Sequence, residues 1–105
     1  MTDPGGTSDA GPPEAVVARR WNVRGQVQGV GFRYFTRSVA RGLRLVGRVR
    51  NLPDGSVEIE VAGDPEKVAD LAAWVRQGPP GAAVTALREE PITPNPTWDR
   101  FDIDR

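Results

Sequence analysis

The stretch LRLVGRVRNLPDGSVEIEV, residues 43 to 61, decides the fold, because two alternating runs flank a tight turn. The apolar residues of both runs fall at odd-numbered positions: Leu43, Leu45, Val49, Val57, Ile59 and Val61. Such alternation predicts a half-buried strand on each side, and an Asp-Gly pair between two such runs is a strong hairpin signal. The hairpin would set Arg48 and Arg50 across from Glu58 and Glu60, and each such pair contributes about 0.2–1 kcal/mol.

A helix is predicted before the hairpin, over residues 31–41. Phe32, Phe35 and Val39 recur there at helical spacing, and Gly42 follows as the C-terminal cap. We expect Thr36, Arg37 and Arg41 mainly on the solvated face of this helix, although a Thr36 hydroxyl near a pocket is the alternative.

A second helix is predicted after the hairpin. Asp64 is a suitable N-cap, Pro65 takes the first helical position, and an apolar stripe continues until Gly78 ends the helix.

Outward from these elements, three more strands are predicted. Trp21, Val23 and Val27 alternate with polar residues, and residues 83–90 and 98–103 form two strands separated by a proline-rich loop. The order is therefore βαββαβ with a short C-terminal strand. This is the ferredoxin-like sandwich of the α+β class, which we expect to have an antiparallel sheet with both helices on one face.

The length of 105 residues allows one domain, which we place at residues 15–105. Residues 1–14 are rich in Gly, Pro, Asp, Ser and Thr and predict a disordered tail. No stretch approaches the roughly 20 apolar residues of a membrane span, and no signal peptide is found, so we expect a cytoplasmic protein.

The composition narrows the possible chemistry. Cysteine and histidine are absent, which excludes disulfide scaffolds, thiol nucleophiles, most zinc sites and every catalytic arrangement that uses imidazole. Although the net charge is zero, residues 15–53 hold nine arginines and no acid. This basic block suggests an anionic ligand, unless folding brings the acids of the rest of the chain beside the arginines.

One turn is suited to such a ligand. The first two strands are joined by a helix and run parallel, so the loop at residues 28–32 and Asn51 should meet at one edge of the sheet. Gly29 and Gly31 allow a close backbone approach just where a helix begins, and Arg33 can add a bidentate guanidinium. The loop lacks the Gly-Lys-Ser/Thr of a P-loop.

Two segments carry a family resemblance: GQVQGVGFR at residues 25–33 and GRVRNLPDGSV at residues 47–57. They resemble the G-x-V-Q-G-V-x-F-R and G-x-V-x-N-x-x-D-G-x-V signatures of the acylphosphatases, and the likeness extends over roughly residues 18–105. Many animal members of the family have a hydroxyl residue at the position of Leu52. The Asn-Leu-Pro-Asp-Gly form of this sequence instead resembles microbial members.

The resemblance implies hydrolysis of acyl phosphates to a carboxylate and inorganic phosphate, without metal or organic cofactor. We also expect a monomer. It further implies that Arg33 binds the phosphoryl group together with the backbone N–H groups of the loop, and that Asn51 positions the attacking water. The loop residues concerned are Gln28, Gly29, Val30, Gly31 and Phe32.

Two alternatives remain. The same fold class includes modules that bind RNA on the sheet face, but here the outward strand positions hold arginine and glutamate instead of the aromatic residues such modules use. A phosphate-binding domain without turnover is the other alternative, and the presence of both Arg33 and Asn51 disfavours it.

Overall fold

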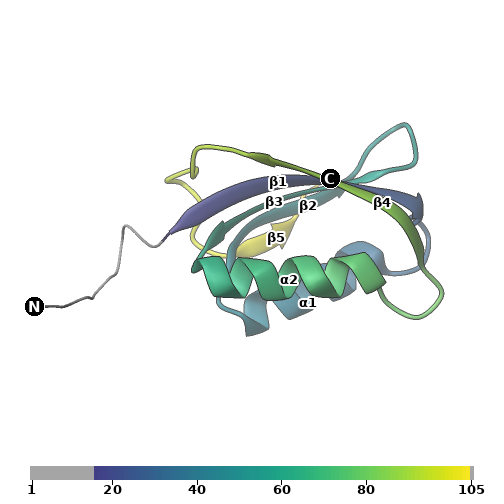
Figure 1. The fold of residues 1–105 in the computed structure, drawn as a ribbon, viewed down its shortest axis with the longest axis horizontal. Helices are drawn as coiled ribbons and strands as arrows, with labels where there is room; N and C mark the ends of the chain where they lie inside the picture. The colour runs from purple at the N-terminus through teal and green to yellow at the C-terminus, as the bar shows by residue number, and fades with distance from the viewer. Residues whose placement is uncertain (1–15, 105) are drawn as a thin grey trace, which may run out of the picture.

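The computed structural model describes residues 16–104, in which five strands form one sheet and two helices cover one of its faces (Figure 1). The elements are β1 (Val17–Gln26), α1 (Phe32–Gly42), β2 (Val46–Asn51), β3 (Val57–Gly63), α2 (Pro65–Gln77), β4 (Ala83–Pro91) and β5 (Phe101–Ile103). The predicted order is confirmed. The predicted tail lies outside the described residues. Neither helix is long and apolar enough to cross a membrane.

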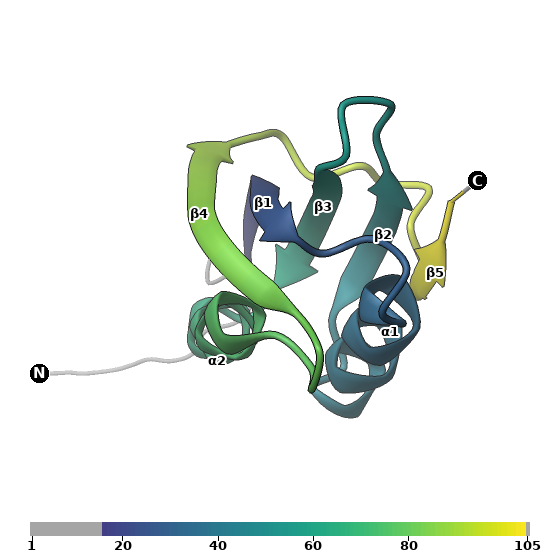
Figure 2. The same ribbon diagram turned by 90° about the vertical axis from the view of Figure 1, so that its right-hand side faces the viewer.

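The strands lie in the order β4-β1-β3-β2-β5, with β4 and β5 at the two edges (Figure 2). Because β1 and β2 both pair antiparallel with β3, they run parallel to each other, as predicted. Strands β1 to β4 pair antiparallel, as predicted, and the short C-terminal strand β5, whose direction was not predicted, pairs in parallel with β2. After β4 the chain crosses to the other edge of the sheet. There β5 runs antiparallel to β4 and therefore in the same direction as β2.

The hairpin between β2 and β3 has the predicted register. Arg48 is across from Glu60 and Arg50 from Glu58, and the guanidinium Nε atoms donate to the carboxylates at 2.7 and 2.9 Å. These pairs lie on the face of the sheet opposite the helices. The alternate residues of the two strands, such as Val49 and Ile59, therefore point into the core.

The core fills the space between the sheet and the two helices. Its largest fully buried side chains come from the strands, from the residues next to them and from both helices: Trp21, Phe32, Phe101, Leu45, Ile59, Leu71, Val23, Val27, Val49, Val57, Val61 and Val75. The Asp64 side chain accepts a hydrogen bond from the backbone N–H of Glu66 at 2.8 Å, which confirms the predicted N-cap of α2.

Helix α1 departs from the predicted pattern in the face that it buries. The buried residues are Phe32, Thr36 and Ala40, whereas Phe35 is 44% exposed. The expected solvent position of Thr36 is therefore wrong. The predicted face and the buried face both have helical spacing, so the sequence alone does not distinguish them. Packing selects the face with Thr36 and Ala40, because their small side chains allow the helix to approach the sheet closely.

The end of α1 also differs from the prediction. The left-handed residue after the helix is Arg44 (φ 60°), and Gly42 remains in the helix. Leu45 N–H donates to Ala40 O and Arg44 N–H to Arg41 O, both at 3.0 Å, which is the hydrogen-bond pattern of a Schellman motif. The motif thus puts a non-glycine residue in a conformation that favours glycine.

Candidate functional site

The loop between β1 and α1 turns sharply at two glycines. Gly29 has φ 80° and Gly31 has φ 76°, a region that residues with a Cβ seldom adopt. Gly31 is the N-cap of α1, no side chain caps this end, and the first turn of the helix contains no acidic residue. Backbone N–H groups without intrahelical partners and the positive end of the helix dipole therefore face this loop.

A pocket of about 260 Å³ opens at this point. Its walls are Val27, Gly29, Gly31, Phe32, Arg33, Tyr34, Asn51 and Ile103. The fold thus brings together Arg33 and Asn51, which are eighteen residues apart in the chain, as the parallel arrangement of β1 and β2 predicted. Of the predicted site residues, only Gln28 and Val30 do not line this pocket.

Gln28 ties the loop to the hairpin. Its Nε2 donates to the backbone oxygens of Leu52 and Ser56, each at 2.9 Å. Since Leu52 directly follows Asn51, this amide fixes the distance between the two halves of the pocket. The side chain of Val30 is half-buried and packs against the core.

Asn51 is the last residue of β2 and is half-buried. Its Oδ1 is buried and has no hydrogen-bond partner within residues 16–104. A buried amide oxygen is ordinarily satisfied by protein or by ordered water, so this acceptor is not consumed by the fold and suits a small donor in the pocket. Thr36 Oγ1 is likewise buried and without a partner in the described part of the chain.

The arginines of the basic block separate into two groups. Six pair with acids from other parts of the chain: Arg19, Arg20, Arg24, Arg41, Arg48 and Arg50. Among the described residues, Arg33, Arg37 and Arg44 have no acidic partner. Folding therefore cancels much of the basic block and leaves positive charge on α1, beside the pocket.

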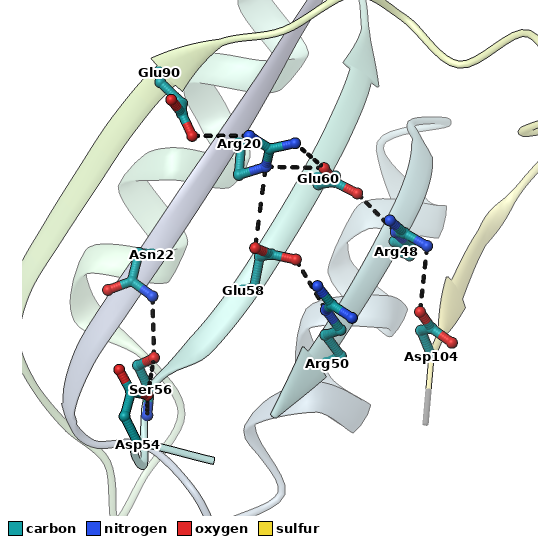
Figure 3. Close-up of polar contacts among 10 residues, drawn as sticks. All are labelled: Arg20, Asn22, Arg48, Arg50, Asp54, Ser56, Glu58, Glu60, Glu90 and Asp104. Carbon is teal, nitrogen blue, oxygen red and sulfur yellow. Dashed lines mark hydrogen bonds and ion pairs between the residues drawn. The ribbon is translucent and has the colours of Figure 1, made fainter. Parts of the chain in front are cut away.

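Most of the cancelled charge lies on the open face of the sheet, where Figure 3 shows the network in front of the strands. Glu60 is at its centre, with its side chain only 6% exposed and its two oxygens shared between Arg20 and Arg48. Burial opposes ionisation of this carboxyl, but the hydrogen bonds from Arg48 and Arg20 outweigh burial and lower the pKa of Glu60.

Arg41 is exposed, as expected for the solvated face of the helix, but it also pairs with an acid. Its Nε donates to Phe101 O at 2.8 Å, and its Nη2 lies 2.7 Å from Asp102 Oδ1. Arg41 therefore fastens α1 to β5, and adds no free charge near the pocket.

Three wall residues were not among the predicted site residues: Val27, which was predicted only as a buried strand position, Tyr34 and Ile103. Tyr34 directly follows Arg33, and its 61% exposure gives the pocket an aromatic rim. Ile103 reaches the pocket because β5 pairs in parallel with β2, where it faces Val49. Its place depends on strand pairing across the sheet, for which the sequence offers no local signal.

Comparison with known proteins gives a consistent picture. The family model described as Acylphosphatase matches residues 19–103. An acylphosphatase of Actinobacillus succinogenes is 43% identical over 90 residues, which are 86% of this chain and 100% of that protein.

Solved structures agree. An acylphosphatase of Coxiella burnetii has a TM-score of 0.84 at 32% identity, covering 91% of this chain and 100% of the other. An acylphosphatase of Bacillus subtilis has a TM-score of 0.81 at 35% identity, covering 85% and 99%.

Proposed function

The chain belongs to the acylphosphatase family and hydrolyses acyl phosphates, and on this basis we propose how its own residues carry out the reaction. The substrate is a small mixed anhydride of a carboxylic acid and phosphoric acid, and the products are the carboxylate and inorganic phosphate. The observation that carries the proposal is the single pocket shared by the N-terminus of α1, Arg33 and Asn51.

Arg33 and the loop at residues 28–32 bind the phosphoryl group. The guanidinium can donate two parallel hydrogen bonds to phosphoryl oxygens, and the uncapped backbone N–H groups at the start of α1 supply further donors. These donors are fixed before the substrate arrives, so they stabilise the charge that develops in the transition state without reorganisation.

Asn51 positions the attacking water. Its unpartnered Oδ1 accepts a hydrogen bond from the water, whose oxygen then attacks phosphorus in line with the acyl oxygen. The bond between phosphorus and the acyl oxygen breaks, the carboxylate leaves, and a phosphoryl oxygen takes the water's proton. A carboxylate is a good leaving group, so the reaction needs positioning and charge stabilisation more than a side-chain base.

The open sheet face supports this function over nucleic-acid binding. Arg20, Arg48 and Arg50 on this face are engaged by Glu60 and Glu58, so these three offer little free positive charge to a phosphate backbone (Figure 3). We further propose that the protein is a cytoplasmic monomer that needs neither a metal nor a cofactor, as the sequence predicts.

The test is hydrolysis of benzoyl phosphate in the presence of EDTA, with inorganic phosphate affinity measured in parallel. Arg33→Ala should lose at least about 10²-fold in kcat/KM and most of its phosphate affinity, because it removes a charged donor. Asn51→Ala should lose turnover while largely keeping phosphate affinity.

Arg76→Ala is the matched control, since Arg76 is an exposed arginine on α2, away from the pocket. It should behave as the wild type in both assays. An equal loss of phosphate affinity in the Arg33 and Asn51 variants would contradict the assigned roles, and loss of turnover in EDTA would contradict a metal-independent reaction.

A further inference from the structure

Arg37 is the second arginine of α1 without an acidic partner among residues 16–104. It lies four residues after Arg33, so the two side chains share one side of the helix, about 6 Å apart along its axis. The positive charge at the pocket therefore has two centres.

Arg37 contacts a residue of the pocket wall. Its guanidinium carbon lies 5.0 Å from the centroid of the Tyr34 ring, and Tyr34 is a wall residue of the pocket. Phe35 meets the same ring edge-on, with a centroid distance of 6.3 Å. A cation over an aromatic face is attracted to it, so Arg37 is held at the rim of the pocket.

The direction of a bound substrate follows from the proposed function, on which this inference rests. With the phosphoryl group at Arg33 and the loop, the acyl group occupies the rest of the pocket, whose walls include Tyr34 and Ile103. A short acyl chain would then end beside the guanidinium of Arg37.

We propose that Arg37, held on the Tyr34 ring, binds a second anionic group at the end of the acyl chain. The enzyme would then prefer acyl phosphates that carry a carboxylate or phosphate a few atoms beyond the carbonyl over those with a neutral chain. The spacing of about 6 Å between the two arginines along the helix suits a chain of a few carbon atoms. Arg37 is thus a residue that determines specificity.

Two stable phosphonates test this preference. 4-Phosphonobutanoate and butylphosphonate present the same anionic head on comparable chains, but only the first ends in a carboxylate. Their inhibition constants are measured against benzoyl phosphate hydrolysis at low ionic strength. The wild type should bind 4-phosphonobutanoate about fivefold more tightly, the upper range for an exposed ion pair.

The ratio of the two constants is the readout in the variants. Arg37→Gln should bring the ratio close to one, and Arg37→Lys should restore part of it. Arg44→Gln is the matched control, because it removes the same charge just beyond the other end of α1 and should keep the wild-type ratio.

The outcomes separate this inference from the proposed function. A folded wild type that does not hydrolyse benzoyl phosphate would overturn both. A wild type that hydrolyses it but binds the two phosphonates equally would overturn this inference alone. The inference is also overturned if Arg37→Gln keeps the ratio, or if Arg44→Gln loses it.

Discussion

Gln28→Leu should lower the free energy of unfolding by about 2 kcal/mol. The substitution roughly keeps the bulk of the side chain and removes two hydrogen bonds of 2.9 Å, each of which contributes about 1 kcal/mol. The loss should not be much greater, because both acceptors keep a backbone partner. Ser56 O still accepts from Leu52 N–H, and Leu52 O from Gly55 N–H.

Urea unfolding followed by tryptophan fluorescence measures this loss, since Trp21 is completely buried. The midpoint should fall with an unchanged m-value. Gln26→Leu is the matched control, because Gln26 lies two residues earlier on β1 and is exposed. The reasoning is refuted if the two variants differ by less than about 0.5 kcal/mol, the usual range for surface substitutions.

The same variant tests whether the Gln28 bridge also positions the site. Since the hairpin holds Asn51 just before Leu52, kcat should fall more than phosphate affinity. A destabilised variant with the wild-type kcat would show that the bridge supports the fold without positioning Asn51.

Three further substitutions are expected to change stability in defined directions. Arg44→Gly should stabilise the protein by about 0.5–1 kcal/mol, because glycine adopts φ 60° without steric cost; a lower melting temperature would contradict this. Thr36→Val should stabilise it by about 1 kcal/mol by removing an unpartnered buried hydroxyl, with kcat/KM unchanged; a tenfold loss of activity would instead place the hydroxyl in the site. Glu60 has a lowered pKa in the folded state, so its contribution to stability is present above the unfolded pKa of about 4.3 and is lost as the pH falls further. Glu60→Gln should therefore flatten the decline of unfolding free energy below about pH 4.3, and an unchanged pH profile would show that Glu60 does not contribute to it.

The features predicted correctly from the sequence are those with a local physical signal. The Asp54-Gly55 turn fixes the hairpin register, and Asp64 before Pro65 fixes the start of α2. The proximity of Arg33 and Asn51 was also predicted correctly. Strands β1 and β2 are consecutive in the chain and are joined by a helix, so they run parallel and bring both residues to one edge of the sheet.

The features that were predicted wrongly, or not predicted at all, depend on distant contacts. Which face α1 buries is set by how closely Thr36 and Ala40 approach the sheet, and neither residue has a strong hydrophobic signal. The direction of β5 follows from the crossing of the chain to the far edge of the sheet. In both cases local propensity allows two answers, and tertiary packing selects one.

The distribution of charge depends both on local strand alternation and on the packing of α1 against the sheet. In β2 and β3, Arg48, Arg50, Glu58 and Glu60 all have even numbers and therefore point to the same face of the sheet. Acids on this face neutralise arginines on this face, whereas Arg33 lies on a helix behind the sheet, beyond their reach. Strand parity thus indicates that Arg48 and Arg50 are neutralised by the acids of β3. The charge left at the pocket is positive because those acids are engaged on the opposite face.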